Sequence, residues 1–219
     1  MRNKPIIGIA LLILFSTFIS QNQFTINKFE IKEIKIENNE ILEDQELINI
    51  FSFLYGKNII FLNGYELKKN IDQKSFIEKI EIKKIFPDKL VIKVFEKEPI
   101  AILIDKNQKK YYMGKKIDLI EYRKIFKYEN LPIVEGEAKN FKKLFDNLIK
   151  INFPTDQIIK YRYFKVNRWN IEMIDKKILK LPEKNYIESL KNFMIIKDKS
   201  NFEKYKTFDY RLNNQLVLK

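Results

Sequence analysis

The sequence contains no histidine and no cysteine among its 219 residues, and only five glycines and six prolines. Without histidine, the chain lacks the imidazole that serves as general base in Ser-His and Cys-His pairs and as a zinc ligand. Without cysteine, it has neither a thiolate nucleophile nor a disulfide, although this absence does not fix the redox compartment. The commonest hydrolase and zinc-enzyme mechanisms are therefore excluded.

Positive charge is in surplus, with 42 Lys and Arg against 29 Asp and Glu and a formal net charge of +13. Such a surplus suggests an anionic partner, either nucleic acid or a membrane surface. The lysines, however, are spread through every predicted element and are interleaved with Glu and Asp. This dispersal favours solvated surfaces over a single nucleic-acid-binding stripe, so we expect no nucleic-acid partner.

Catalytic motifs are also missing. Glu96 with Glu98, or Glu135 with Glu137, could be imagined as an acid-base pair near a turn, but surface charge is the commoner role of such carboxylates. No serine has the context of a nucleophile elbow, and the glycines form no phosphate-binding loop. We therefore expect no catalytic, cofactor or metal site and interpret the protein as a non-enzyme.

The chain begins with Arg2 and Lys4 followed by an apolar run over residues 5–20. As a helix, this run reaches roughly 24 Å against a hydrocarbon core of ~30 Å, so it either borrows flanking residues or forms a signal-peptide core. The end of the run lacks the small residues that signal cleavage requires, which favours a retained anchor. The leading basic residues predict a cytoplasmic amino terminus and a translocated remainder.

We therefore predict a cytoplasmic tail over residues 1–4 and a transmembrane anchor over residues 5–23. The side chains expected to form the anchor are Pro5, Ile6, Leu11, Leu12, Leu14, Phe15, Phe18 and Ile19.

Residues 24–98 are predicted to form a small domain with the order strand, helix, short helix, strand, strand. Apolar and charged residues alternate over residues 33–37, as in a half-buried strand. A helical apolar stripe follows Asp44 and stops at Gly56, and a short helical turn follows Gly64. Two further strand-like runs flank the turn at residues 86–88, which predicts a β-hairpin.

Residues 99–219 are predicted to form a mixed β domain with two helices, whose apolar stripes include Leu144 and Leu190. Trp169 is expected to be a core or cap residue. Residues 206–219 are predicted to be a strand that continues to the last residue and lies at an exposed sheet edge. The predicted fold is thus α+β: a transmembrane helix, a β-α-α-β-β domain, and a mixed β domain in one sheet or two.

In this order, these elements resemble the bacterial FtsQ/DivIB family of cell division proteins, which combines one membrane span, a POTRA domain and a C-terminal β domain. The resemblance covers essentially the whole chain, and the segments that carry it are residues 34–37, 56–58, 61–62, 85–90, 96–101, 167–171, 179–182 and 208–212.

The resemblance implies a non-catalytic scaffold of the divisome, a single-pass protein of the inner membrane found at the division septum, with most of its chain in the periplasm. It implies binding to FtsB and FtsL through the C-terminal β domain, linking early to late division proteins and helping to control septal wall synthesis. The POTRA domain would recruit other division proteins or act as a spacer. No cofactor is implied.

Strand addition at the last strand is the binding mode that this resemblance favours. Tyr210 and Arg211 are residue types that often anchor interfaces. The residues expected to bind the partner are Tyr210, Arg211, Leu212, Asn213, Asn214, Gln215, Leu216, Val217 and Leu218.

Two other interpretations remain open. A POTRA-bearing accessory protein of secretion or outer-membrane assembly would normally carry repeated POTRA units or a barrel of alternating strands. An exported wall enzyme would need a catalytic constellation, which the absence of histidine and cysteine disfavours.

Overall fold

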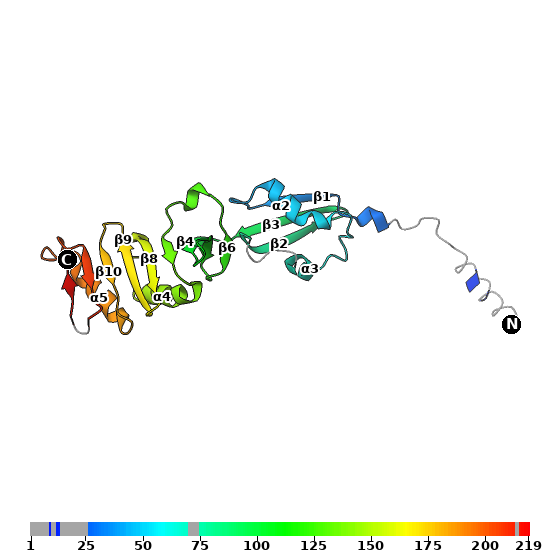
Figure 1. Ribbon diagram of the computed structural model, residues 1–219. Helices are drawn as coiled ribbons and strands as arrows, with labels where there is room; N and C mark the ends of the chain where they lie inside the picture. The colour runs from blue at the N-terminus through cyan, green and yellow to red at the C-terminus, as the bar shows by residue number, and fades with distance from the viewer. Residues whose placement is uncertain (1–8, 10–11, 14–25, 70–74, 213–214) are drawn as a thin grey trace. The chain divides into compact units, whose positions relative to one another are not determined.

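A computed structural model of the chain describes residue 9 and residues 12–13, 26–69, 75–212 and 215–219 (Figure 1). The chain divides into two compact units. The first consists of Met1–Asn70 and Ile80–Val94, and the second of Ile71–Lys79 and Phe95–Lys219.

The first unit follows the order β-α-α-β-β that the sequence predicts. Its elements are η1 (Ile26–Phe29), β1 (Glu33–Glu37), α2 (Asp44–Phe51) with η2 (Ser52–Leu54), α3 (Gly64–Lys69), β2 (Ile77–Ile85), whose first three residues belong to the second unit, and β3 (Lys89–Glu96). The sheet order is β1-β3-β2, with β1 parallel to β3. The turn at residues 86–88 joins β2 to β3, so the predicted hairpin is present.

The core of the first unit follows from the helical spacing of its apolar residues. Leu47, Phe51 and Leu54 recur every three or four positions along α2 and η2 and are fully buried. β3 is the central strand, and its Leu90 and Ile92 are also fully buried. β3 therefore supplies the centre of this core, while its charged residues are exposed or partly exposed.

The second unit contains a single mixed sheet, which answers the question that the sequence left open. Its elements are β4 (Pro99–Ile104), β5 (Lys110–Gly114), β6 (Leu119–Glu121), η3 (Phe126–Tyr128), β7 (Ile133–Glu135), α4 (Ala138–Lys150), η4 (Thr155–Gln157), β8 (Ile158–Phe164), β9 (Arg168–Met173), β10 (Ile178–Lys180), α5 (Tyr186–Ile196), β11 (Thr207–Asp209) and β12 (Val217–Leu218). The order is β12-β11-β10-β9-β8-β7-β4-β5-β6.

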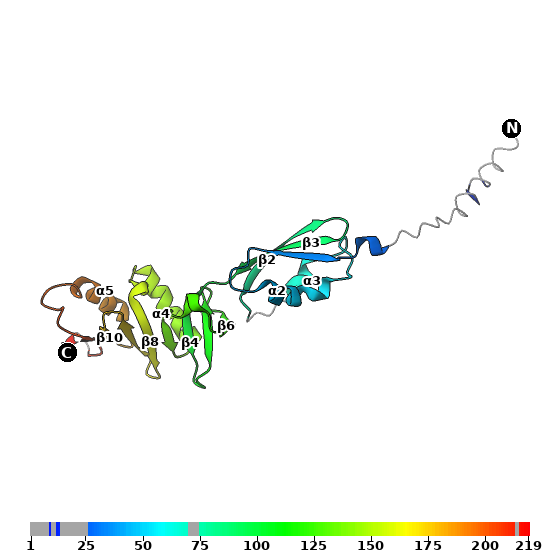
Figure 2. The same ribbon diagram turned by 90° about the horizontal axis from the view of Figure 1, so that it is seen from above.

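Helices α4 and α5 cover the same face of this sheet (Figures 1 and 2). In β9 the side chains alternate: Trp169, Ile171 and Met173 are buried, and the residues between them are partly exposed. Alternation of this kind places every second residue under the helices. Trp169 is 6% exposed, so the expectation that it is a core residue is confirmed. The protein is an α+β fold.

The prediction of one strand over residues 206–219 is wrong. The segment contains two short antiparallel strands, β11 and β12, separated by residues 210–216. Local side-chain contacts explain the interruption. The Arg211 backbone N–H donates to the Asp209 carboxylate, a side-chain turn that bends the chain, and the Gln215 N–H donates to the Leu212 carbonyl oxygen.

Candidate partner-binding edge of the sheet

The C-terminal strand β12 is the last strand in the order of the second unit's sheet. Leu218 lies opposite Phe208 and Val217 opposite Asp209 in β11. β11 in turn runs parallel to β10. The end strand of a sheet has one row of backbone N–H and C=O groups that another chain can pair with.

The register of β12 determines which of its residues present that outer row. The Lys219 N–H donates to the Thr207 oxygen (3.1 Å) and the Thr207 N–H donates to the Lys219 oxygen (2.9 Å), so these two residues form a hydrogen-bonded pair. Hydrogen-bonded and non-hydrogen-bonded pairs alternate along an antiparallel ladder. The backbone groups of Leu218 therefore point away from β11, to the outer side of the sheet, and those of Val217 point inward.

The side chains of β12 are half-buried. Leu216 and Leu218 pack against the apolar core of the second unit, and Val217, which lies between them, is also partly exposed. Partial burial leaves apolar surface at the edge while holding the strand to the sheet. The edge is therefore fixed by side-chain packing on one side and open to main-chain pairing on the other.

Tyr210, expected to be an interface anchor, is instead directed into the protein. It is 8% exposed, its hydroxyl donates to Asn192 Oδ1 of α5 (2.9 Å), and its backbone N–H donates to the Lys180 oxygen of β10 (2.9 Å). Burial raises the pKa of the Tyr210 hydroxyl. The tyrosine thus fastens the end of β11 to β10 and to α5, and it supports the edge from within.

Arg211 forms a bidentate ion pair with Asp209. Arg211 Nε donates to Asp209 Oδ1 (2.8 Å), and Nη2 lies 2.5 Å from Oδ2. These hydrogen bonds from Arg211 hold the pKa of the Asp209 carboxyl below its usual value, against the opposing effect of burial. The guanidinium side chain is 41% exposed, so Arg211 can meet a partner with one face while it remains bound to Asp209.

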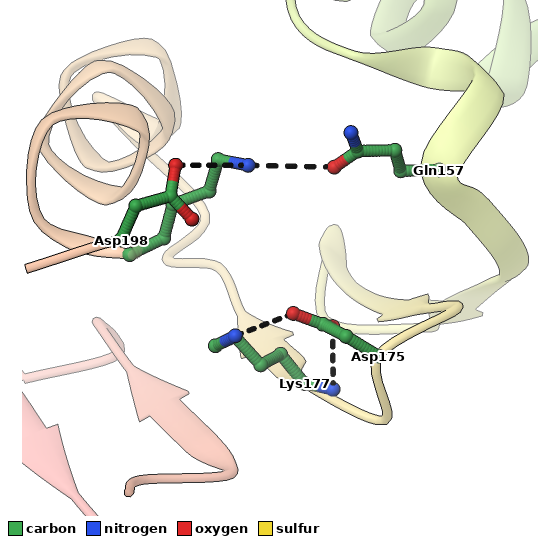
Figure 3. Close-up of polar contacts among 5 residues, drawn as sticks. Gln157, Asp175, Lys177 and Asp198 are labelled. Atoms are coloured by element: carbon green, nitrogen blue, oxygen red, sulfur yellow. Dashed lines mark hydrogen bonds and ion pairs between the residues drawn. The ribbon is translucent and has the colours of Figure 1, made fainter. Parts of the chain in front are cut away.

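A second polar cluster fixes the turn from which β10 begins (Figure 3). Lys177 is 7% exposed; its ammonium group is paired with the Asp175 carboxylate, and its backbone N–H donates to Asp175 Oδ1 (3.1 Å). Beside this turn, Lys197 Nζ lies 3.4 Å from both Gln157 Oε1 and Asp198 Oδ2. Burial opposes the charge of Asp175, but the hydrogen bonds from Lys177 outweigh it and lower the pKa of Asp175.

The remaining predicted binding residues lie around the turn between β11 and β12. Leu212 is 55% exposed and Gln215 is exposed. Asn213 and Asn214 lie outside the described residues. The structure therefore brings Arg211, Leu212 and β12 to one end of the sheet.

Two residues at this edge carry roles that sequence reasoning did not assign. Asp209 holds Arg211, and an acidic residue two positions before an arginine is a local signal that could have revealed the pair. Asn192 holds Tyr210 across 18 residues of sequence, and nothing in the helical stripe of α5 distinguishes it.

One carboxylate of each pair that was considered for acid-base chemistry forms ion pairs with lysine or arginine. Glu135 lies 2.6 Å from Lys160 Nζ and 2.7 Å from Arg162 Nε, and Glu98 is paired with Lys115. Burial opposes the charge of Glu135, but both hydrogen bonds outweigh it and lower its pKa, which suits a structural anion better than a general acid. Among the described residues, no group of three or more acidic side chains could hold a metal ion.

The predicted anchor falls mostly outside the described residues. Of its expected side chains, only Leu12 is described; it is helical and 71% exposed. Within the described part of the chain, none of the helices combines the length and the apolar character needed to cross a bilayer. The anchor stays a prediction. Its residues outside the described part are Pro5, Ile6, Leu11, Leu14, Phe15, Phe18 and Ile19.

Comparison with known proteins finds similarity over most of the chain. The family model of the FtsQ-type POTRA domain matches residues 29–97. The cell division protein FtsQ of Rickettsia bellii is 24% identical over 200 residues, which cover 87% of this chain and 72% of the relative. FtsQ of Rickettsia felis is 25% identical with the same coverage. DivIB of Clostridium acetobutylicum is 30% identical over 108 residues, 49% of this chain and 43% of the relative.

The fold and the matched region define a POTRA-containing protein whose second unit is a mixed sheet with a C-terminal end strand. The relatives extend the likeness beyond the POTRA region to most of the chain. The chain is similar to cell division proteins FtsQ and DivIB, over most of its length in the Rickettsia relatives, which confirms the resemblance inferred from the sequence.

Proposed function

We propose that the protein is a non-catalytic scaffold of the divisome that binds FtsB- and FtsL-type proteins by strand addition at β12. In this role it helps to link early and late division proteins and to control septal wall synthesis. The observation that carries the proposal is the position of β12 at the end of the nine-stranded sheet, with Leu218 on its outer side. Similarity to cell division proteins over most of the chain supports the cellular role.

The chemistry of the edge fits a partner that adds an extended strand. Main-chain hydrogen bonds to Leu218 would supply much of the affinity, and the half-buried Leu216 and Val217 would supply contacts that set the register. Arg211 and Leu212, at the same end of the sheet, would add contacts beyond the strand itself. Tyr210 acts indirectly, because it holds the end of β11 in place.

The proposed topology is that of a single-pass protein of the inner membrane. Residues 1–4 would be the cytoplasmic tail, residues 5–23 the anchor, residues 24–98 the POTRA domain and residues 99–219 the β domain. The basic residues ahead of the apolar run and the lack of the small residues that signal cleavage requires support this topology. The POTRA domain would stand next to the bilayer, where it could recruit further division proteins.

The experiment that tests strand addition compares a proline variant and an alanine variant of Leu218 in the full-length chain. Leu218→Pro removes an N–H that points to the outer side of the sheet, so we expect it to abolish co-purification of an FtsB-type partner. The pairing of β12 with β11 does not use that N–H, so the fold should remain intact, as measured by the fluorescence of Trp169. Leu218→Ala keeps the N–H and should retain most of the binding.

Photo-crosslinking in cells gives an independent readout. A crosslinker at Val217 should capture a division partner, and the same group at Ile159, an exposed residue of β8 that is 46% exposed, should not. Fluorescent fusions should form a midcell band. Capture of division partners from residues of the first unit alone, with none from residues 212–218, would rule out binding at β12.

A further inference from the structure

The first unit exposes a group of large apolar side chains at one end, which we call the aromatic end. Phe61 is 81% exposed, Tyr65 74% and Phe86 58%, and Ile60 and Ile85 are exposed beside them. Isolated exposed apolar residues are normal on a protein surface, but a contiguous group marks a site of contact. The aromatic end is therefore a candidate contact surface.

Specific contacts hold these side chains together. Lys84 Nζ of β2 donates to the backbone oxygens of Ile60 and Leu62, at 3.1 Å each, and so fixes the loop after η2 against the hairpin. The Phe86 ring at the hairpin turn packs edge-on against Phe29, with ring centroids 6.5 Å apart. The aromatic end is thus built from three separate segments held in one place.

The chain enters the first unit at this same end (Figures 1 and 2). The Ile59 N–H donates to the Phe29 oxygen (2.8 Å), and Ile31 exchanges hydrogen bonds with the loop at Gly56 and Lys57. If the anchor ends at residue 23, the three residues of chain to Ile26 can reach at most about 11 Å. The tether therefore holds the start of η1 close to the membrane surface.

The charge and shape of this end suit a phospholipid surface. The segments that meet there, residues 26–33, 55–65 and 83–89, contain more lysines than acidic residues. Two of the acidic groups are paired, Asp88 with Lys32 (3.9 Å) and Glu33 with Lys89 (2.5 Å). An apolar groove of about 470 Å³ continues the surface and is lined by Leu62, Gly64, Tyr65, Leu67, Ile80, Ile82 and Lys84.

We propose that the aromatic end of the first unit inserts Phe61, Tyr65 and Phe86 into the headgroup region of the bilayer. Aromatic side chains favour this zone, and lysines beside them interact with anionic headgroups. The inference rests on the anchor of the proposed function, because only a short tether brings this end to the membrane. Contact with lipid would fix the orientation of the first unit on the bilayer.

Lipid quenching of an introduced tryptophan tests this proposal in the full-length chain. The full-length Phe61→Trp variant is incorporated into nanodiscs of phosphatidylcholine and phosphatidylglycerol, with and without brominated acyl chains. We expect the new emission to be blue-shifted and to be lost in brominated lipid. The native Trp169, buried in the second unit, supplies a constant background. Tyr65→Trp provides a second position and should behave in the same way.

Phe126→Trp is the matched control, because Phe126 is 89% exposed and belongs to the second unit. Its emission should show no loss in brominated lipid. Incorporation into nanodiscs without quenching at residue 61 would overturn this proposal and leave the strand-addition function standing. Failure of the chain to enter nanodiscs would overturn the anchor and this proposal together. Capture of a protein by a crosslinker at residue 61, with no lipid quenching, would assign the surface to that protein instead.

Discussion

The aromatic side chains in the core of the second unit and those at the aromatic end of the first unit differ in their exposure. In the second unit, Phe141, Phe193 and Phe208 are fully buried and form edge-on ring contacts, such as that of Phe193 with Phe208 at 5.0 Å. In the first unit, Phe61 and Phe86 are mainly exposed. Buried rings stabilise a fold through area removed from water, whereas exposed rings do so only when a partner covers them. Phenylalanine therefore stabilises the core of the second unit and, as proposed, provides contact at the aromatic end of the first.

The two units also offer two different kinds of contact surface, the sheet edge at β12 and the aromatic end. β12 offers main-chain groups, and its side chains are half-buried in the core. The aromatic end offers side chains on loops whose own backbone is hydrogen-bonded. The first kind of surface suits an extended protein segment, which needs backbone partners, and the second suits a lipid surface, which needs none.

Truncation of a buried ring should give the largest effect. Phe193→Ala removes a fully buried ring that contacts both Phe153 and Phe208. We expect a loss of about 3–5 kcal/mol in the free energy of unfolding of the second unit, because a cavity is left in the core. Urea titration followed by Trp169 fluorescence measures it. Phe126→Ala, in the same unit, should change the midpoint very little, and an equal loss in both variants would contradict the comparison.

The ion pair beside β11 should contribute less and should depend on pH. Arg211→Gln removes the hydrogen bonds that lower the pKa of Asp209, and we expect a loss of about 1 kcal/mol at pH 7, given the exposure of the arginine. A carboxyl with a lowered folded pKa stabilises the protein above its unfolded pKa of about 3.9, and this stabilisation is lost as the pH falls through the folded pKa.

The difference between wild type and Arg211→Gln should therefore shrink between pH 5 and the folded pKa of Asp209. Urea midpoints measured at pH 7, 5 and 3 follow this change. Arg168→Gln, in β9 of the same sheet, controls for the loss of an arginine. A difference that stays constant with pH would show that Arg211 acts through packing alone.

Replacement by phenylalanine should lower the stability of the protein at one buried tyrosine and leave it unchanged or raise it at another. Tyr210→Phe removes the hydrogen bond to Asn192 and should cost about 1 kcal/mol. The Tyr161 hydroxyl is buried without a hydrogen-bond partner among the described residues, so Tyr161→Phe should be neutral or stabilising by up to about 1 kcal/mol. Burial raises the pKa of Tyr161, so stability should fall as the pH rises above about 10 in the wild type.

Thermal unfolding of the two phenylalanine variants at pH 7 and pH 10.5 measures both effects. Tyr161→Phe should reduce the alkaline loss of stability. A destabilised Tyr161→Phe variant would mean that the hydroxyl has a partner in solution.

Local sequence patterns predicted most helices and strands of the fold. They could not predict the order of the strands in the sheet, which depends on contacts between residues distant in sequence. The hairpin at residues 86–88 and the helical stripe of α4 follow from turn chemistry and spacing, which act within a few residues. The sheet order of the second unit depends on pairings such as β4 with β7, which are parallel and distant in sequence. No local pattern reports such pairings.

At the candidate site, too, local sequence patterns predicted one part and long-range contacts determined another. Its place at the C-terminal strand was predicted from the sequence, but the extent of that strand was not. The interruption after β11 arises because Tyr210 reaches Asn192 in α5 and Arg211 folds back on Asp209. The alternation of apolar residues over 206–219 suits a strand equally well with or without these contacts. The inward position of Tyr210 therefore had to come from the structure.

Truncation at the aromatic end should give the smallest effect on stability. Phe61→Ala removes a ring that is 81% exposed, so little buried area is lost and the free energy of unfolding should change by less than about 0.5 kcal/mol. Circular dichroism during urea titration of the full-length chain measures it, with Phe51→Ala, a fully buried ring of α2, as the matched control. We expect the Phe51 variant to lose about 3–5 kcal/mol.

A cost at Phe61 close to that at Phe51 would mean that the aromatic end belongs to the core of the first unit, and the contrast with the buried rings of the second unit would fail. A negligible cost leaves Phe61 without a role in stability, and its exposure is then best explained by contact with another surface.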